Sequence, residues 1–222
     1  MFDRSRPLLI VMDVDSTVIE QEVIELIAAH AGVEDRVRAV TDAAMRGELD
    51  FAASLQARVA LFEGLPESVL DDVRTSVRLT TGARELVDTL HADGHVVALV
   101  SGGFDAIVAD IAANVGADHF RANALEVVDG RLTGRVTGEI VDRAVKARML
   151  VEYAALHAIP LMNTIAVGDG ANDLDMMRDA AIGIAFCAKP VVRASADASI
   201  DVRDLRGVLD IIAANATPDA GR

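Results

Sequence analysis

Two aspartates separated by a single residue are the first feature of this sequence that could do chemistry. Asp13 and Asp15 follow a short apolar run, in the stretch Asp13-Val14-Asp15-Ser16-Thr17. Alternate residues of an extended chain point to the same side, so both carboxylates can face one cavity. Two carboxylates held together repel each other unless a cation lies between them, and Mg²⁺ prefers oxygen ligands. The pair is therefore a candidate metal site, although an aspartate that caps a turn or a helix is the alternative interpretation.

A second acidic motif, Gly168-Asp169-Gly170-Ala171-Asn172-Asp173, follows another apolar run. Asp169 ends that run, and its carboxylate is a further candidate ligand for the same metal ion. Asp173 lies at the start of a helical segment, where it could order the ligands through hydrogen bonds or water. The glycine spacing fits neither a dinucleotide-binding fingerprint nor a P-loop. A turn followed by a helix cap is the alternative interpretation of this motif.

Two further segments carry groups suited to a phosphate ligand. Ser101 and Gly102 offer a hydroxyl and an unhindered N–H directly before a predicted helix, whose N-terminus attracts anions. Lys146 lies at the start of another predicted helix, and its compact ammonium could neutralise a phosphate oxygen. Taken alone, Lys146 is more simply interpreted as a solvated surface residue. A metal ion and a lysine together supply the positive charge that phosphoryl transfer requires.

Short apolar runs and helical patterns alternate along the chain, and the polar motifs come at the ends of the runs. The predicted strands span residues 8–12, 95–100, 164–167 and 182–186, and the predicted helices span residues 84–91, 104–115, 144–157 and 174–181. This alternation predicts an α/β fold, a Rossmann-like open parallel sheet flanked by helices. Ligands bind such sheets beyond the carboxyl ends of the strands, where the polar residues above are expected to converge.

The spacing of the first two strands predicts an insertion between them. Roughly 80 residues separate these strands, whereas one crossover connection needs only about a dozen. Residues 18–78 repeat apolar side chains at helical spacing and are punctuated by glycine and proline. We therefore expect an inserted helical cap at residues 18–78 and an α/β core formed by residues 1–17 and 79–222. Residues 125–136 alternate around Asp129-Gly130, which predicts a β-hairpin.

Composition excludes several classes of function. The 222 residues carry 21 basic and 35 acidic side chains, a net charge of −14, so neither a nucleic-acid partner nor an anionic membrane surface is expected. The longest apolar run, Ala180–Ala188, is far shorter than the roughly 20 residues of a membrane span. Cys187 is the only cysteine, which excludes a disulfide framework and a cysteine metal cluster. A soluble, cytoplasmic protein is expected.

The motifs and their order resemble the haloacid dehalogenase superfamily. D-x-D-S-T follows the first predicted strand, a serine follows the second, and a lysine precedes G-D-x-x-x-D after a later strand. Within that superfamily the chain is similar to the phosphoserine phosphatase family along nearly its whole length. The similar segments are residues 13–22, 47–65, 100–104, 167–173, 184–190 and 204–206. The resemblance implies a HAD-like core with an inserted cap and Mg²⁺ as the cofactor.

The resemblance also implies a role for each motif. Asp13 would be the nucleophile that forms an aspartyl-phosphate, and Asp15 would protonate the leaving oxygen and later deprotonate water. Asp13, the backbone carbonyl of Asp15, and Asp169 would bind Mg²⁺, with Asp173 behind them. The residues implied to hold the phosphoryl oxygens are Ser101, Gly102, Lys146 and Asn172.

A small-molecule substrate follows from the same resemblance. Glu22 would pair with the ammonium of O-phosphoserine and Arg58 with its carboxylate, while Phe51 would cover the site. An arginine fork matches a carboxylate in bidentate fashion, so these residues would recognise a zwitterion rather than any phosphate ester. The expected reaction is Mg²⁺-dependent hydrolysis of O-phospho-L-serine to L-serine and phosphate, the last step of serine biosynthesis.

Several alternatives stay open at this point. The same scaffold could pass the phosphoryl group to an alcohol such as homoserine, or hydrolyse another small phosphate ester. A non-catalytic phospho-acceptor domain of the receiver type also has an acidic pocket on a parallel sheet, but it lacks a large helical insertion. Arg143 or Arg148 could contact the phosphate in place of Lys146, whose neighbours match the family loosely. Only seven residues precede the first strand, so the N-terminal regulatory domain of many bacterial members is not expected.

Overall fold

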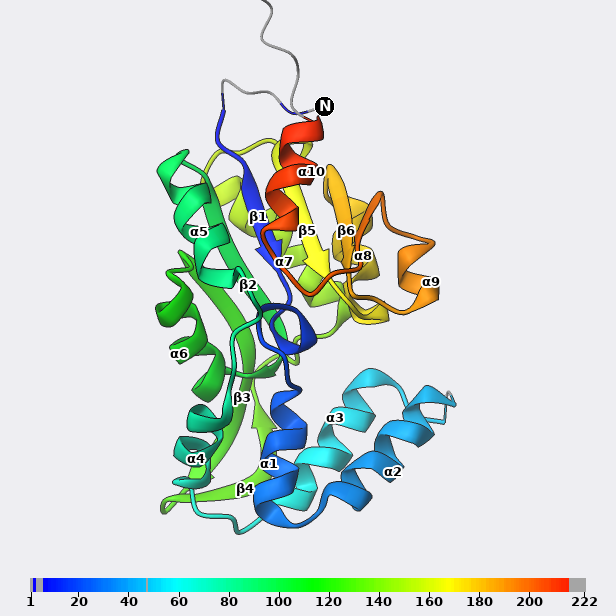
Figure 1. Ribbon diagram of the computed structural model, residues 1–222. Coiled ribbons are helices and arrows are strands. Elements are labelled where there is room, and N and C mark those ends of the chain that lie inside the picture. Colours follow the sequence, from blue (N-terminus) through cyan, green and yellow to red (C-terminus); the bar gives the residue numbers. More distant parts are fainter. Residues whose placement is uncertain (1, 3–5, 47, 216–222) are drawn as a thin grey trace, which may run out of the picture.

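The computed structural model describes residue 2, residues 6–46 and residues 48–215. In this part of the chain seven strands form one sheet in the order β4-β3-β2-β1-β5-β6-β7. Neighbouring strands run parallel except β3 and β4, which are antiparallel. The strands are β1 (Leu9–Met12), β2 (Val96–Phe104), β3 (His119–Val128), β4 (Arg131–Thr137), β5 (Thr164–Gly168), β6 (Ile182–Phe186) and β7 (Ala198–Ile200). This arrangement confirms the predicted α/β fold (Figure 1).

The central strand β1 shows why this sequence forms a parallel sheet. Each of its four residues is completely buried. Leu9 and Val11 belong to one hydrophobic cluster and Ile10 and Met12 to the other, so alternate side chains fill the cores on opposite faces. Strands covered on both faces are apolar throughout. The first polar residue after such a strand therefore marks the end of the strand. The first acidic motif follows β1 in this way, and the second lies at the end of β5.

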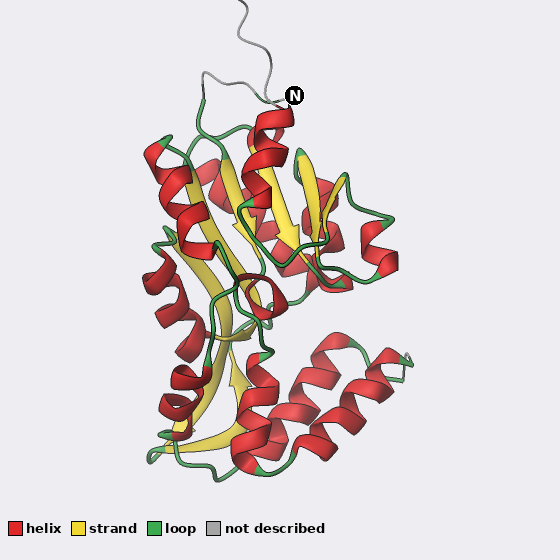
Figure 2. Ribbon diagram, viewed as in Figure 1, coloured by secondary structure: helices red, strands yellow, loops and turns green. Residues whose placement is uncertain are grey.

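Helices cover both faces of the sheet (Figure 2). One core takes buried residues from α5 (Ala83–Ala92), α6 (Asp105–Val115) and α10 (Gly207–Asn215). The other takes them from α7 (Arg143–Leu156), α8 (Leu174–Asp179) and α9 (Pro190–Arg193). The helices α5 to α8 occur close to their predicted ends, whereas α9, α10 and strand β7 were not predicted. None of the helices in the described ranges combines the length and the apolar character that crossing a bilayer requires.

Helices fill most of the predicted cap, residues 18–78. They are α1 (Val23–Ala31), α2 (Glu34–Met45), α3 (Phe51–Val59) and α4 (Val69–Ser76), with a 3-10 turn at Ala60–Phe62. Helices α1 to α3 lie beyond the carboxyl ends of the parallel strands, whereas α4 lies in line with α6 (Figure 1). Arg74 of α4 donates from Nη2 to the Ala106 carbonyl of α6 (2.8 Å). The domain boundaries themselves stay a prediction.

The predicted β-hairpin is present, and it supports the insertion. Strands β3 and β4 pair around Asp129 and Gly130, whose φ angles of 50° and 69° are positive, as a type I′ turn requires. The Gly64 N–H donates to the Leu132 carbonyl (2.8 Å), and the Leu132 N–H donates to the Leu65 carbonyl (2.9 Å). The hairpin is therefore joined to the insertion by backbone hydrogen bonds.

Two extended segments carry the chain into and out of the insertion. Ile19 and Leu79 form an antiparallel bridge, and the Thr80 N–H donates to the Val18 carbonyl (2.9 Å). The entry segment follows directly on the first acidic motif. The start of the insertion is thus held next to that motif.

Candidate active site

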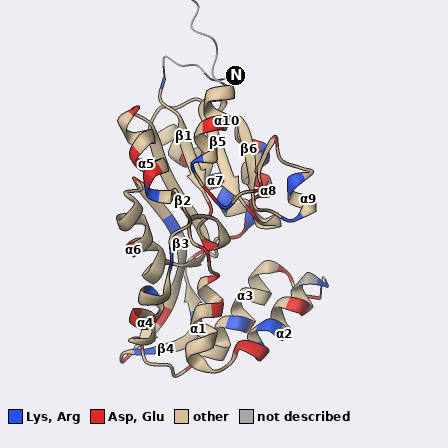
Figure 3. Cartoon of the chain, in the orientation of Figure 1, with Lys and Arg blue, Asp and Glu red and all other residues tan. Residues whose placement is uncertain are grey.

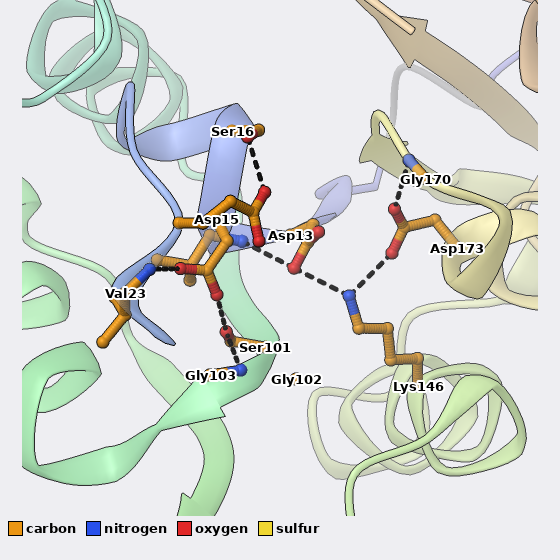
Figure 4. A network of polar contacts seen from close by, with 12 residues as sticks. Asp13, Asp15, Ser16, Val23, Ser101, Gly102, Gly103, Lys146, Gly170 and Asp173 are labelled. Atoms are coloured by element: carbon orange, nitrogen blue, oxygen red, sulfur yellow. Dashed lines mark hydrogen bonds and ion pairs between the residues drawn. The ribbon is translucent and has the colours of Figure 1, made fainter. Parts of the chain in front are cut away.

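Asp13 directly follows β1 and is buried, with 4% of its surface exposed. Its backbone N–H donates to the Val167 carbonyl of β5 (2.9 Å), which extends the sheet pairing to the strand end. Its Oδ1 accepts from the Val14 N–H (2.8 Å) and lies 2.7 Å from Nζ of Lys146 (Figure 4). Burial, together with the nearby Asp173, raises the pKa of Asp13 well above its ordinary value in spite of Lys146. The ionised form of Asp13 therefore needs further positive charge.

Lys146 lies in the first turns of α7 and is fully buried, so its interpretation as a solvated surface residue is wrong. Its Nζ bridges two carboxylates, at 2.7 Å from Oδ1 of Asp13 and 2.7 Å from Oδ1 of Asp173. Burial disfavours the ammonium, but these two carboxylates outweigh it and hold the pKa of Lys146 above its ordinary value. Arg143 and Arg148, the alternatives for this position, form ion pairs with other acidic residues.

Three aspartates form an acidic group beyond the strand ends. Asp13, Asp169 and Asp173 each offer a carboxylate oxygen, and these oxygens lie within 4.8 Å of one another. Asp173 is fully buried; its Oδ1 binds Lys146 and its Oδ2 accepts from the Gly170 N–H (3.1 Å). Burial and the neighbouring Asp173 raise the pKa of Asp169 to about 6. Asp173 uses both oxygens on protein partners, so Asp13 and Asp169 are the members best placed to bind a ligand.

This acidic group fits a hard divalent cation. Burial raises the pKa of Asp13, Asp15 and Asp169, and the neighbouring carboxylate of Asp173 adds to the shift of Asp13 and Asp169. A divalent ion would supply the missing positive charge, and carboxylate oxygens are ligands that Mg²⁺ prefers. The predicted ligands were Asp13, Asp15 and Asp169, whereas the structure groups the carboxylate of Asp173 with Asp13 and Asp169. The predicted contribution of Asp15, through its backbone carbonyl, stays a prediction.

The Asp15 side chain is directed toward β2 and the insertion. Its Oδ1 accepts from the Val23 N–H (2.8 Å) at the start of α1, and its Oδ2 accepts from the Ser101 hydroxyl (3.0 Å) on β2 (Figure 4). Burial raises the pKa of Asp15, although these two hydrogen bonds oppose the shift. Ser16 follows with a φ of 56°, in the left-handed region that non-glycine residues rarely adopt. Asp15 thus joins the first acidic motif to the serine segment and to the insertion.

The serine segment is a bulge within β2 rather than the loop expected after a strand ending at Val100. The strand continues through Ser101-Gly102-Gly103 to Phe104, and its register against β3 shifts between Val100 and Phe104. The Ser101 hydroxyl accepts from the Gly103 N–H (2.8 Å), which stabilises the bulge. Ser101 is fully buried, and its hydroxyl faces Asp15. The bulge therefore brings Ser101 and Gly102 to the acidic end of β1.

Three residues of the insertion reach the same region. The Ser16 hydroxyl donates to Oε1 of Glu22 (2.6 Å), and burial, with carboxylates nearby, raises the pKa of Glu22 to about 7. Arg58, on α3, is partly buried; burial lowers its pKa, and the charge of Glu22 opposes that shift. The ring of Phe51 packs against Gly102: a Cβ added to this glycine would lie 3.1 Å from the ring. The structure thus brings these three side chains to the serine segment and the acidic motif.

Asn172 lies beside the acidic group, in the 3-10 turn Ala171–Asp173. The side chain is half-buried and packs against Gly170, where an added Cβ would collide with its Oδ1. Glycine at position 170 therefore lets the asparagine lie this close to the backbone. Every predicted site residue thus lies in one region beyond the ends of β1 and β5, although the role assigned to each stays a prediction.

Two residues near the site were not predicted. Arg203 donates from Nη1 to the Ser16 carbonyl (2.9 Å), and its guanidinium lies 5.8 Å from the centre of the Phe186 ring. Asn123, on β3, is buried and bonds to the serine segment. A lone asparagine between two alanines was the available signal for Asn123. Nothing local in the sequence marks Arg203, because its partners are far away along the chain.

Comparison with known sequences connects this site to an enzyme family. Residues 10–178 match the haloacid dehalogenase-like hydrolase family. The chain is 59% identical over 204 residues to a phosphoserine phosphatase of Streptomyces coelicolor. The aligned residues make up 92% of this chain and 50% of that protein. The chain is 51% identical over 204 residues to a phosphoserine phosphatase of Streptococcus thermophilus, covering 92% of this chain and 95% of that protein. The chain thus spans half the length of the first relative and nearly all of the second.

Solved structures show the same similarity in three dimensions. A phospho-aspartyl intermediate analogue of a phosphoserine phosphatase matches with a TM-score of 0.87 at 44% identity, covering 93% of this chain and 99% of that chain. A substrate-bound phosphoserine phosphatase complex matches with a TM-score of 0.88 at 43% identity, covering 93% of this chain and 98% of that chain. The match therefore includes both the sheet and the helical insertion.

Proposed function

The chain belongs to the haloacid dehalogenase-like hydrolase family, and we propose that it hydrolyses O-phospho-L-serine to L-serine and phosphate with Mg²⁺. The observation that carries the proposal is the buried ammonium of Lys146 between Asp13 and Asp173. Beside this group, the charges of Glu22 and Arg58 interact with each other and with Asp15. The ammonium of Lys146 with its aspartates suits a phosphoryl group, and the pair Glu22 and Arg58 suits the ammonium and carboxylate of a zwitterion. The similarity to phosphoserine phosphatases supports the substrate. The reaction would be the last step of serine biosynthesis, in the cytoplasm.

Asp13 is the proposed nucleophile. A carboxylate oxygen of Asp13 attacks phosphorus, the bond to the seryl oxygen breaks, and an aspartyl-phosphate forms. Asp15 donates a proton to the leaving seryl oxygen, and burial, which raises its pKa, favours the protonated form. Asp15 then takes a proton from the water that attacks phosphorus, and phosphate leaves Asp13. The likeness to a phospho-aspartyl intermediate analogue supports this route.

The phosphoryl oxygens would be held by groups of the core. The hydroxyl of Ser101, the N–H of Gly102, the ammonium of Lys146 and the amide of Asn172 are the proposed donors. Preorganised donors of this kind stabilise the charge of the transition state without reorganising during the reaction. Asp173 keeps the ammonium in position, since its Oδ1 lies 2.7 Å from Nζ.

Asp13, Asp169 and the backbone carbonyl of Asp15 are the proposed ligands of Mg²⁺. The carboxylate oxygens of the acidic group lie close enough together to share one ion. When bound, the ion supplies positive charge to the phosphoryl oxygens. Asp173 would not bind the ion itself; it orients the site through its hydrogen bonds with Lys146 and the Gly170 N–H.

Glu22 and Arg58 would recognise the amino-acid part of the substrate. In the described part of the chain, the one hydrogen bond that Arg58 donates runs from Nε to the Ser54 carbonyl (3.2 Å), so both Nη groups are available for a carboxylate. Glu22 would bind the ammonium, which requires its ionised form. Phe51, packed on Gly102, would cover the bound phosphoryl group.

The alternatives are less well supported. The relatives described above are phosphatases, so transfer to an alcohol acceptor is not favoured. A receiver-type phospho-acceptor domain is not favoured either, because helices α1 to α4 form a large insertion between β1 and β2.

Phosphate release tests the proposal directly. The protein is assayed with O-phosphoserine, O-phosphothreonine, phosphoglycolate and a sugar phosphate, with and without Mg²⁺. We expect a preference for O-phosphoserine and a requirement for the metal. Asp13→Asn should keep the fold and abolish turnover, because an amide is no nucleophile, whereas Asp175→Asn on α8 should stay active. Equal rates with all four esters would refute the substrate, and turnover by Asp13→Asn would refute the covalent step.

A further inference from the structure

Asn123 is a buried asparagine whose side chain bonds to two segments of the site. It lies on β3 with 1% of its surface exposed. Its Nδ2 donates to the Gly102 carbonyl (2.8 Å), and its Oδ1 accepts from the Val141 N–H (2.8 Å). One amide therefore joins the bulge of β2 to the segment that leads into α7.

The bond to Gly102 fills a gap in the ladder between β2 and β3. The two strands pair at Val100 with Arg121 and again at Phe104 with Asn123. Three residues of β2 lie between these pairs but only one residue of β3, so the backbone groups of the bulge cannot all pair with β3. The Asn123 amide supplies the donor that the Gly102 carbonyl needs at this place. Removal of that donor would leave the partly buried Gly102 carbonyl unpaired, which destabilises the bulge.

The bond to Val141 fixes the start of α7. Val141 is fully buried and directly precedes Asp142, the N-cap of the helix. The Asp142 carboxylate accepts from the Val145 N–H (2.9 Å), and its carbonyl accepts from the Lys146 N–H (2.9 Å). Because Lys146 is anchored to the cap in this way, a shift of Val141 would move the ammonium relative to the acidic group. The hydrogen bond that the Val141 N–H donates to Oδ1 of Asn123 opposes that shift.

We propose that Asn123 is a positioning residue for the phosphoryl group. It holds the bulge Ser101–Gly103 and the ammonium of Lys146 at a fixed separation, so that both contact the same phosphoryl group. This inference rests on the proposed function, since it takes these two segments as the phosphate-binding ones. The partners of Asn123 belong to the core, whereas Glu22 and Arg58 lie on the insertion. Recognition of the amino-acid part is therefore expected to depend on Asn123 much less than the binding of the phosphoryl group does.

Inhibition by inorganic phosphate and by L-serine separates the two halves of the site. In Asn123→Ala we expect the inhibition constant of phosphate to rise at least about tenfold, on the scale of a lost buried hydrogen bond, and kcat to fall. The inhibition constant of L-serine should stay nearly unchanged. Equal changes in the two constants would overturn the proposal, because they would indicate a general loss of structure.

Asn163→Ala is the matched control. Asn163 is also fully buried, but it precedes β5 and so lies at the opposite end of the strands from the acidic group. Its substitution should lower the melting temperature without a selective loss of phosphate affinity, and the same selective loss in this variant would overturn the proposal. If the wild type hydrolyses p-nitrophenyl phosphate but not O-phosphoserine, the proposed function fails, while the phosphate constants of the two variants still test Asn123.

Asn123→Asp provides a second measurement if the alanine variant does not fold. A protonated carboxyl offers one O–H donor and one acceptor, as the amide does for these two bonds, whereas the ionised form offers acceptors only. The affinity for inorganic phosphate, relative to the wild type, should therefore be higher at about pH 5.5 than at about pH 8. A ratio that does not change with pH would overturn the proposal.

Discussion

Nζ of Lys146 lies 2.7 Å from Oδ1 of Asp13, and both side chains are buried beyond the end of β1. The same ammonium lies 2.7 Å from Oδ1 of Asp173. Buried carboxylates without a compensating cation are strongly destabilising. The pair that the proposed chemistry uses is therefore also a pair on which the stability of the fold depends.

Lys146→Met should abolish activity and destabilise the metal-free protein. Removing one partner of a buried ion pair costs about 3–5 kcal/mol, because the remaining charge is left uncompensated. Urea unfolding near neutral pH measures this loss. Arg148→Met is the control, since Arg148 pairs with Glu139 at an exposed position, where ion pairs contribute about 0–1 kcal/mol. Equal losses in the two variants would contradict the importance assigned to the buried pair.

Glu22 predicts a dependence of stability on pH. Burial, with Asp15 nearby, raises its folded-state pKa to about 7 from an ordinary value of 4.5. The folded state therefore binds more protons than the unfolded state between these two pH values, so the free energy of unfolding falls as the pH rises through this range. In the metal-free protein Glu22→Gln should reduce that fall by an amount on the order of 1–3 kcal/mol, measured by urea unfolding at about pH 5 and pH 7.5.

The control for this measurement is Glu34→Gln, an exposed position on α2. This variant should keep the pH dependence of the wild type. If Glu22→Gln also keeps it, a different group titrates in this range, and Glu22 is not held in an unfavourable charged state.

The parts of this fold that depend on local pattern could be predicted from the sequence. Apolar runs buried on both faces end abruptly, so Asp13 and Asp169 could be placed at strand ends. The hairpin followed from Asp129-Gly130, because both residues of its turn need a positive φ. Both of these signals lie within a few residues of the structure that they determine.

The contacts between distant segments could not be predicted. Lys146 looks like any lysine in a polar stretch, and its burial depends on β1 and β5 lying beside α7. The same holds for Asn123, whose partners lie on β2 and before α7, and for Arg203, which reaches back to Ser16. Periodicity states which face of an element is apolar, but it does not state which polar groups meet.

Metal binding should stabilise the protein more at neutral than at acidic pH. Burial and the neighbouring Asp173 raise the pKa of Asp169 to about 6, and a carboxyl group must lose its proton to bind a metal ion. Mg²⁺ should therefore raise the melting temperature at about pH 7.5 and raise it much less at about pH 5. Each kcal/mol of stabilisation by binding corresponds to a rise of roughly 2–4 °C for a chain of this size. Chelation should remove both this stabilisation and the activity, and added Mg²⁺ should restore them.

The metal prediction has a matched pair of variants. Asp169→Asn should lose the response of the melting temperature to Mg²⁺, because it removes a member of the acidic group. Asp175→Asn, on α8, should keep it, since Asp175 is paired with Arg143 and Arg178 instead. A full response in Asp169→Asn would show that the ion binds elsewhere.

Arg58 predicts how the site distinguishes substrates. Arg58→Ala should lower kcat/KM for O-phosphoserine by roughly 2–4 kcal/mol of transition-state stabilisation, about 30- to 1,000-fold, because the substrate carboxylate loses its charged partner. O-phosphoethanolamine keeps the ammonium and lacks the carboxylate, so its kcat/KM should hardly change. Glu22→Gln should show the converse and spare phosphoglycolate, which has a carboxylate but no ammonium. If Arg58→Ala impairs O-phosphoserine and O-phosphoethanolamine equally, Arg58 supports the fold of α3 rather than recognition of the carboxylate.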